Sequence, residues 1–358
     1  MTACYVDSTQ AACTIAQAID ARGDHDPVKT PAPRATTRAG SYRRSSGHPH
    51  RRPAPHPDDA DRRTRPVPLT DLSAPAGAVL GRRYRLDDAL GSGGSGAVYR
   101  ATDLRLDRRV AVKVFDLGAA DGEEIRRYAA EARVLAGLAH PHLVALLDVG
   151  ADQLTGVGPV AFLVMELVEG RTLRDVVADG PLPRGLVADV GRQLALGLGH
   201  AHGAGVVHRD VKPSNVLVAE RPSSPGGRFD SPWLPVVLAD FGIAVSTSST
   251  ASRTQPSSGT ASYQSPEQAL GREVGPATDV YSLGLVLLEC LTGHRVYPGD
   301  PLTASLARLL RPVEVPSDLG RDWELLLAAM TAGDPADRPT PAAVAAELRA
   351  LRALDPPS

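Results

Sequence analysis

A glycine-rich segment is the first part of the chain whose residue types and spacing suggest chemistry. It has the form GxGxxGxV and consists of Gly91, Ser92, Gly93, Gly94, Ser95, Gly96, Ala97 and Val98. Glycine has no side chain to keep a backbone away from phosphate oxygens. The same spacing also marks dinucleotide-binding turns, which join a strand to a helix. Here β-like runs lie on both sides, at Tyr84–Leu90 and Ala97–Thr102, so we predict a phosphate-binding loop between two strands.

A lysine on the next β-like run, Arg109–Phe115, could reach a phosphate held by this loop. Lys113 follows the apolar sequence Val110-Ala111-Val112. Most lysines on strands are solvated edge residues, and Lys113 taken alone would be interpreted in that way. The motifs farther along the chain favour a second interpretation, an ammonium group that neutralises phosphate charge.

Five further motifs follow in order along the chain. They are His208–Asn215 (HRDVKPSN), Asp240–Gly242 (DFG), Ser265–Glu267 (SPE), Asp279–Gly284 (DVYSLG) and Asp337–Pro339 (DRP). Together with the glycine-rich segment and Lys113, they resemble the eukaryotic-type (Hanks-type) protein kinases, and closely the bacterial serine/threonine branch. The resemblance implies an α+β, bilobal protein kinase fold with a β-rich N-lobe and an α-helical C-lobe.

The resemblance also implies how phosphoryl transfer would be divided among residues. Lys113 is expected to contact the α- and β-phosphates of ATP and to be held by a glutamate on a helix. We choose Glu131, which lies nine residues before the His140-Pro141 pair, as the family pattern expects. Asp210 is expected to accept a hydrogen bond from the acceptor hydroxyl and to orient it for attack. Lys212 is expected to meet the γ-phosphate as charge develops.

ATP and Mg²⁺ are the cofactors that the resemblance implies, with Mn²⁺ as a substitute metal. Asp240 is expected to bind the Mg²⁺ that bridges the phosphates, and Asn215 is expected to bind the second Mg²⁺. Met165 is expected to guard the back of the adenine pocket. Besides the glycine-rich segment and Lys113, the expected ATP contacts are Val98 and Ala111 around the ring and Glu166 and Val168 in the hinge.

Two residues indicate serine or threonine as the acceptor. Lys212 lies in an Asp-x-Lys-Pro-x-Asn pattern that resembles serine/threonine kinases, whereas tyrosine kinases usually carry a displaced arginine in this loop. Thr260, in the pair Gly259-Thr260, resembles the threonine that bonds to the catalytic aspartate and lysine. The resemblance therefore implies a protein serine/threonine kinase that transfers the γ-phosphate of ATP to serine and threonine hydroxyls of proteins.

Other motif residues are expected to hold the site in place. Glu267 and Arg338 resemble the buried ion pair that ties the activation segment to the C-lobe, where losing one partner would leave an unpaired charge. Asp279 is expected to cap and brace a buried helix. The internal column that aligns active kinases is expected from Leu135, His208 and Phe241.

A hydroxyl-rich stretch lies between the DFG and SPE motifs. Residues 246–258 contain nine Ser or Thr among thirteen residues, a composition that is also typical of a solvated loop. Arg209 directly precedes Asp210, and kinases of this type order the loop by pairing that arginine with a phosphorylated residue. We therefore predict autophosphorylation here. The candidate sites are Thr254 as the main site, with Ser252 and Thr250 as secondary sites.

The hydrophobic pattern supplies the elements that would position these motifs. Further strands are predicted at His142–Val149 and Val160–Leu167, with a helix at about 122–138 between the two groups of strands. Helices dominate after Gly170, and one buried face repeats every four residues at Leu186, Val190, Leu194 and Leu198. The stretch Val280–Leu291 is apolar almost all round, as in a helix that crosses a core. A cleft between the two lobes is the expected ligand site.

The predicted domains are an arm at 1–79 and a kinase domain at 80–355, divided into an N-lobe at 80–167 and a C-lobe at 168–355. Residues 29–65 contain ten Lys or Arg and three Asp, with Pro and Ser interleaved. Such a segment buries too little apolar surface to offset its ordering entropy, so we predict a disordered arm. It is a solvated tail, an over-long start to the reading frame, or a basic arm that docks acidic partners or membrane surface. Residues 219–235 are predicted to be a surface insertion, with Phe229 and Trp233 as candidate docking residues.

The overall composition excludes several classes of protein. The chain has 358 residues, 42% of them hydrophobic, and a net charge of −2, which gives no general attraction to nucleic acid or anionic membranes. Cys4, Cys13 and Cys290 form no CxxC pair, as is typical of a reducing compartment. No apolar run reaches the roughly 20 residues of a membrane helix. We therefore expect neither the transmembrane helix nor the sensor domain that most membrane-bound relatives carry after the kinase. We predict a soluble, cytoplasmic protein with protein substrates, no nucleic-acid partner and a homodimer that activates in trans.

Two other classes of protein stay open as alternatives. A pseudokinase scaffold would bind partners without transferring phosphate, but such proteins usually lose the equivalents of Lys113, Asp210 or Asp240. A small-molecule phosphotransferase of the same fold is the second alternative. Thr260 and Arg338 argue against it, because the resemblance gives them a part in shaping a peptide-binding segment.

Overall fold

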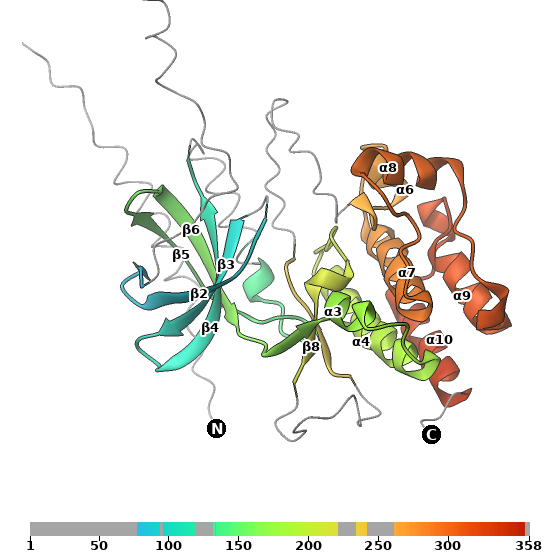
Figure 1. The fold of residues 1–358 in the computed structure, drawn as a ribbon, viewed down its shortest axis with the longest axis horizontal. Helices are drawn as coiled ribbons and strands as arrows, with labels where there is room; N and C mark the ends of the chain where they lie inside the picture. Colours follow the sequence, from blue (N-terminus) through green and yellow to red (C-terminus); the bar gives the residue numbers. More distant parts are fainter. Residues whose placement is uncertain are drawn as a thin grey trace, which may run out of the picture.

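The computed structural model describes residues 77–93, 96–118, 132, 134–220, 234–241 and 261–354. These residues form a β-sheet part followed by a helical part, which lie side by side (Figure 1). Among the helices that the structure describes, none combines the length and the apolar character that crossing a lipid bilayer requires. The predicted arm at 1–79 lies outside the described residues except for its last three.

The sheet part is a six-stranded antiparallel sheet with the strand order β1-β2-β3-β4-β6-β5. Its strands are β1 (Val79–Leu80), β2 (Tyr84–Gly93), β3 (Gly96–Asp103), β4 (Arg108–Asp116), β5 (Leu146–Leu154) and β6 (Gly158–Glu166). Buried and half-buried residues alternate along β3, as the pleat of a strand with one core-facing side requires. Strands β2, β3, β4 and β6 follow the predicted runs closely.

One predicted strand begins in the wrong place. The sequence predicts a strand at His142–Val149, but β5 starts at Leu146. Leu143 is only 2% exposed and packs in the core of the helical part. It forms a single bridge with Leu238, and the carbonyl of His142 accepts the Leu238 N–H at 2.9 Å. The alternating pattern there reflects burial against the helical part and not membership of the large sheet.

The helical part begins with a small three-stranded sheet and continues with helices. The small sheet contains β7 (Gly170–Thr172), β8 (Val216–Ala219) and β9 (Val236–Leu238). The helices are α3 (Leu173–Ala178), α4 (Arg184–Gly203), η3 (Pro213–Asn215), α6 (Pro266–Ala269), α7 (Pro276–Thr292), α8 (Pro301–Leu310), η4 (Ser317–Leu319), α9 (Arg321–Met330), η5 (Pro335–Asp337) and α10 (Pro341–Leu354). The predicted helix at about 122–138 lies mostly outside the described residues, although Val134–Ala136 are helical.

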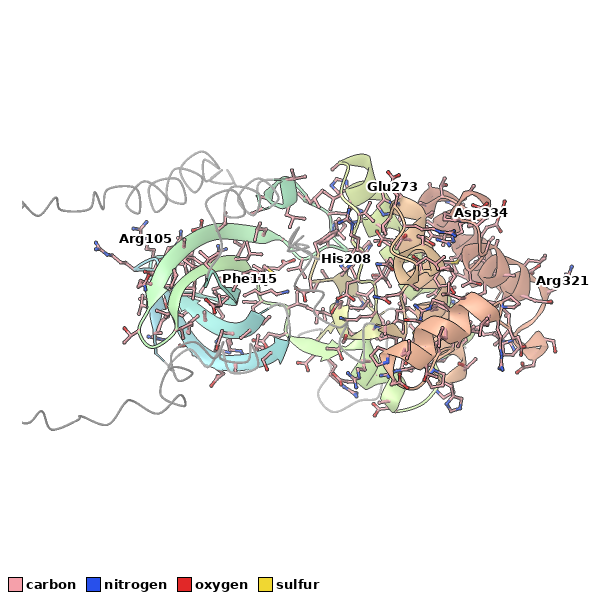
Figure 2. The ribbon with its side chains drawn as sticks, turned by 90° about the horizontal axis from the view of Figure 1, so that it is seen from above. Arg105, Phe115, His208, Glu273, Arg321 and Asp334 are labelled. Carbon is pink, nitrogen blue, oxygen red and sulfur yellow. The ribbon has the colours of Figure 1, made fainter. Side chains whose placement is uncertain are left out.

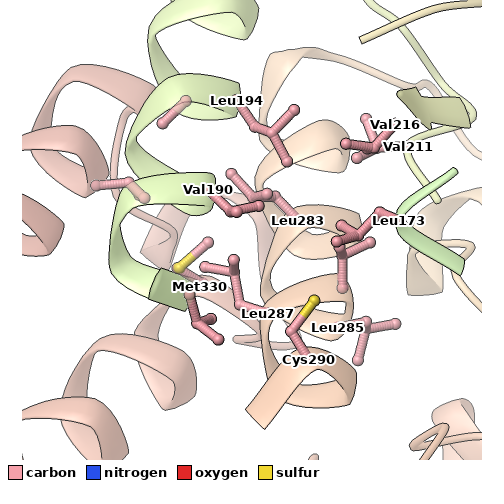
Figure 3. Close-up of a cluster of buried hydrophobic side chains, with 14 of the residues drawn as sticks. Leu173, Val190, Leu194, Val211, Val216, Leu283, Leu285, Leu287, Cys290 and Met330 are labelled. Atoms are coloured by element: carbon pink, nitrogen blue, oxygen red, sulfur yellow. The ribbon is translucent and has the colours of Figure 1, made fainter. Parts of the chain in front are cut away.

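Helix α7 runs through the centre of the helical core, which explains why its sequence is apolar almost all round. Every residue from Thr278 to Leu291 is buried, and Figure 3 shows α7 side chains facing those of α4 and α9. Gly191 lets α4 approach closely, because an added Cβ there would lie 2.9 Å from Leu287. The tightly packed helix α7 is thus a rigid support for the residues of the site.

Candidate active site

The glycine-rich segment forms the end of the β2–β3 hairpin. Gly91 pairs with Val98, Ser92 with Ala97 and Gly93 with Gly96. Gly94 and Ser95 lie outside the described residues. Gly96 has a φ of 125°, and an added Cβ would clash with the carbonyl oxygen of Val114. Only glycine fits at this position, because any side chain here would collide with the backbone of the neighbouring strand β4.

Lys113 lies on β4, in the middle of the large sheet, and not on an edge. It is 6% exposed and pairs with Val98 on β3 and Leu163 on β6. Its Nζ contacts Oδ1 of Asp240 directly, so the lysine reaches across from the sheet part to the DFG motif of the helical part. The solvated-edge interpretation of Lys113 is therefore wrong. Glu131, its predicted partner, lies outside the described residues.

Asp210 has a carboxylate that two neighbours orient. Lys212 donates to its Oδ2 at 2.7 Å, and Asn215 Nδ2 donates to the same oxygen at 3.1 Å and to the Asp210 carbonyl at 2.8 Å. The Asp210 side chain is 27% exposed, whereas Asn215 is buried. The Ala239 N–H donates to the carbonyl of Asn215 at 2.8 Å, which joins this loop to the residue before Asp240. The structure thus brings Asp210, Lys212 and Asn215 together beside Asp240.

Asp279 holds the backbone of this loop from below. Its carboxylate accepts the N–H groups of His208 and Arg209, each at 2.8 Å, and accepts Nε2–H of His202 at 2.8 Å. Arg209 has a φ of 65°, an unfavourable conformation that these bonds help to maintain. His208 lies where the sheet and the helical part meet (Figure 2).

The prediction that Asp279 caps a helix needs correction. Helix α7 begins after Gly275, and no side chain of the described residues caps it. Asp279 lies in the first turn of α7 and is fully buried. Its carboxylate points to the loop that carries Asp210 and satisfies two backbone donors there, together with the ring of His202 on α4.

The predicted internal column comes together in part. The rings of His208 and Phe241 lie 4.7 Å apart. Nε2 of His208 forms a hydrogen bond with the carbonyl of Ala239 at 3.1 Å. Phe241 and Leu135 line one apolar cavity behind Lys113, together with Met165. The role of Met165 at the back of a nucleotide pocket stays a prediction.

The residues expected around adenine are on β3, on β4, at the end of β6 and just after it. Ala111, which is mostly buried, pairs with Met165 across β4 and β6. Glu166 accepts the Ala145 N–H on its side chain at 2.9 Å, which fixes the end of β6. Val98 lies on β3 and Val168 follows β6, both half-buried.

The donor set suits a nucleotide with Mg²⁺. Within the described residues, no three His, Cys, Asp or Glu side chains gather closely enough to form a metal site by themselves. Mg²⁺ commonly takes only one or two protein carboxylates and completes its shell with phosphates and water. Asp240, with a carboxylate that is 35% exposed, and Asn215 beside it meet that need.

Glu267 and Arg338 form a bidentate ion pair in the helical part. Arg338 donates to the two carboxylate oxygens of Glu267 at 2.7 and 2.9 Å, and both side chains are buried. Thr278 adds a hydrogen bond at 2.5 Å. Burial alone would raise the pKa of Glu267, but the bonds from Arg338 and Thr278 outweigh it and lower the pKa to about 2.

The ion pair predicts a loss of stability in acid. The unfolded state binds a proton on Glu267 below about pH 4.5 and the folded state only near pH 2, so the contribution is complete above pH 4.5 and falls below it. The shift corresponds to about 3 kcal/mol. Urea unfolding measures the free energy of unfolding at about pH 6 and pH 3.5. The difference in this free energy between the wild type and Glu267→Gln/Arg338→Met should be smaller at pH 3.5. A difference that is equal at both pH values would assign the acid sensitivity to other groups.

Two residues that hold the site were missed from the sequence. Gln268 Nε2 donates to the carbonyl of Arg209 at 2.8 Å, and Arg308 donates to two carbonyls near the SPE motif. The Ser265-x-x-Gln268 spacing is a recognisable capping-box pattern, and both capping bonds are present. The contacts with Arg209 and from Arg308 connect distant parts of the chain, so no local pattern indicates them.

The fold and the site define a class of protein. Residues 84–348 match the protein kinase domain family, and the chain belongs to that family. Its fold is the bilobal, α+β kinase fold, with a β-sheet N-lobe and a helical C-lobe.

Two similar proteins indicate which branch of the protein kinase family the chain resembles. The chain is 40% identical over 272 residues to serine/threonine-protein kinase PknA of Mycobacterium tuberculosis, covering 75% of this chain and 60% of PknA. It is 41% identical over 285 residues to serine/threonine-protein kinase PknL of Mycobacterium bovis, covering 76% of this chain and 67% of PknL. The chain thus resembles bacterial Hanks-type kinases and spans about 60% of the length of PknA.

Proposed function

We propose that this chain is a protein serine/threonine kinase that transfers the γ-phosphate of ATP to serine and threonine hydroxyls of proteins. The observation that carries the proposal is the meeting of Lys113, Asp240, Asp210, Lys212 and Asn215 where the N-lobe faces the C-lobe. Phosphoryl transfer requires mainly positioning and charge neutralisation, and these five side chains offer both. The names of PknA and PknL support the same activity.

Asp210 and its neighbours prepare the acceptor hydroxyl. Lys212 and Asn215 both bind Oδ2 of Asp210, so we assign Oδ1 to the hydrogen bond from the acceptor. That bond aims the hydroxyl oxygen at the phosphorus and gives its proton a place to go. Lys212, close to the same carboxylate, supplies positive charge where the transferred group gains negative charge.

Lys113 and Asp240 bind and orient the nucleotide. Their direct contact keeps two opposite charges together in the mostly buried space between the lobes. Bound Mg²⁺–ATP supplies the phosphoryl group together with a cation that neutralises its charge. Lys113 would then hold phosphate oxygens, and Asp240 and Asn215 would hold the metal. Glu131 is our candidate for holding Lys113 in that state.

We assign regulation to the loop that precedes the SPE motif. Its candidate phosphorylation sites Thr254, Ser252 and Thr250, as well as Thr260, lie outside the described residues. Arg209 supports the assignment, because it is next to Asp210 and a phosphate on the loop would give its guanidinium a charged partner. Phosphopeptide mapping of the active enzyme is expected to find Thr254 modified most. An unmodified loop in active enzyme would contradict the assignment.

The proposal also covers the location of the protein, its domain bounds and its partners. We infer a cytoplasmic catalytic domain at 80–355, with lobes at 80–167 and 168–355, and a preceding arm at 1–79. We infer that the enzyme acts on protein substrates and uses Mg²⁺ or Mn²⁺. We also infer that it activates in trans within a homodimer. The insertion at 219–235, with Phe229 and Trp233, falls almost wholly outside the described residues.

Incubation with ATP, Mg²⁺ and a generic basic protein tests the proposal. Phosphoserine and phosphothreonine are expected in the substrate, without phosphotyrosine. ATP binding without transfer would favour a pseudokinase scaffold instead. Transfer to small alcohols or amines in preference to protein would favour a small-molecule phosphotransferase.

A further inference from the structure

A buried arginine on α8 holds main-chain carbonyls of the segment that follows the predicted phosphorylation loop. Arg308 is 4% exposed. One terminal nitrogen donates to the carbonyl of Gln264 at 2.6 Å, and the other donates to the carbonyl of Ala261 at 2.5 Å. Its Nε has no hydrogen-bond partner within the part of the chain that the structure describes. A planar fork with two terminal nitrogens suits this double contact, which a single ammonium group cannot reproduce.

Two buried arginines hold the same segment, which we define as the 261–268 segment. Arg308 lies 5.0 Å from the ring centre of Tyr297, and Arg338 lies 4.9 Å from that of Tyr281. The two tyrosine hydroxyls are 3.4 Å apart, so the arginines lie at the two ends of a tyrosine pair. Arg338 holds the segment through Glu267, and Arg308 holds its beginning through carbonyls.

Core stability alone does not require an arginine at this position. Burial lowers the pKa of Arg308, and the nearby Tyr281 and Tyr297 offset this only in part. The hydrogen bonds of Arg308 go to neutral carbonyls, whereas Arg338 has the carboxylate of Glu267. A well-packed apolar side chain avoids the desolvation of a charge and often serves stability as well. The distinctive contribution of Arg308 is the fixed position of two carbonyls.

Those carbonyls belong to a segment that is bonded to the loop carrying Asp210. Ala261 directly follows Thr260, and Gln264 directly precedes Ser265. Between them, the carbonyl of Tyr263 accepts the Ser282 hydroxyl at 2.7 Å. At the other end of the segment, Gln268 is bonded to the carbonyl of Arg209, next to Asp210. The backbone is thus fixed between α8, α7 and the loop that carries Asp210.

We propose that Arg308 is a positioning residue for protein substrates: it fixes the backbone of the 261–268 segment so that an acceptor chain lying on it presents its hydroxyl to Asp210. This inference rests on the proposed kinase activity. Among the described residues, the hydrogen bonds of Arg308 go to Gln264 and Ala261 and not to Lys113, Asp240 or Asp210, so its loss should affect the protein substrate and not ATP. A misplacement of about 1 Å in such a supporting element can cost about 100-fold in rate.

The test compares Arg308→Met and Arg308→Lys in the full chain. Arg311→Met is the control, because Arg311 is exposed directly after the same helix. For Arg308→Met we expect kcat/KM for a basic protein substrate to fall about 10- to 100-fold. The KM for ATP and the rate of ATP hydrolysis without substrate should stay within about twofold. Arg308→Lys should recover part of the loss, and Arg311→Met should behave as wild type.

Hydrogen exchange in the same proteins separates this inference from the proposed function. Amides of the 261–268 segment should exchange faster in Arg308→Met, while those of residues 208–215 should not. An equal fall in ATP hydrolysis and protein phosphorylation, or unchanged exchange in the segment, would overturn the inference. If the wild type transfers no phosphate, the proposed function fails, and the exchange result still decides whether Arg308 holds the segment. If Arg308→Met does not fold, Arg308→Lys supplies both measurements.

Discussion

Replacing Asp210 with asparagine is expected to lower kcat for protein phosphorylation by about 10²- to 10⁴-fold, the usual share of a positioned general base. Asparagine keeps the shape of the side chain and an oxygen for the bonds from Lys212 and Asn215. It lacks the negative charge that accepts the proton of the acceptor hydroxyl. ATP binding should change little, because we assign nucleotide binding to Lys113 and Asp240. Steady-state kinetics and an ATP titration measure the two effects separately.

A control for this variant comes from the surface of the same lobe. Asp322 is exposed in the first turn of α9, far along the chain from the site motifs. Asp322→Asn should leave kcat and ATP binding at wild-type values. An Asp210→Asn enzyme that keeps more than about a tenth of wild-type kcat would remove Asp210 from the role of base.

Replacing Arg338 with methionine is expected to destabilise the protein by about 3–5 kcal/mol. The variant leaves the Glu267 carboxylate buried with the Thr278 hydrogen bond as its remaining side-chain partner. It also frees the carbonyls of Ala277 and Ala332, which Arg338 holds at 3.0 and 2.9 Å. Urea unfolding followed by circular dichroism measures the free energy of unfolding.

A double variant and a surface pair complete this experiment. Glu267→Gln/Arg338→Met should be less destabilised than the sum of the two single variants, because no unpaired charge stays buried. Arg321 and Glu324 form an exposed pair at 3.5 Å, so Arg321→Met should cost less than about 1 kcal/mol. Equal losses from Arg338→Met and Arg321→Met would mean that the buried pair contributes nothing special.

The parts of the site that short motifs encode could be predicted from the sequence. Asp210, Lys212 and Asn215 lie within six residues, and a 3₁₀ turn at Pro213–Asn215 brings their side chains together. The burial of Lys113 could not be predicted from its own strand. It comes from the pairing of β4 between β3 and β6, and the sequence of one strand does not show which strands flank it. The family resemblance supplied that missing information.

Long-range contacts explain what the sequence did not show. Asp279 lies where a capping residue would be plausible, yet its partners are about 70 residues earlier in the chain. His142–Val149 has a strand-like pattern because Leu143 is buried against β9, which comes almost a hundred residues later. Arg308 lies on a helix with four exposed leucines, and nothing local indicates that it turns inward to two carbonyls.

The central claim, that this chain transfers phosphate, is tested most directly by autophosphorylation. Purified wild type would be incubated with labelled ATP and Mg²⁺ beside Asp210→Asn and Lys113→Met, with ATP binding measured in parallel. The account predicts label on serine and threonine of the wild type, at most a trace of label on either variant, and weaker ATP binding only for Lys113→Met. Wild type that binds ATP but incorporates no label, even with Thr254→Glu in place of phosphate, would contradict it.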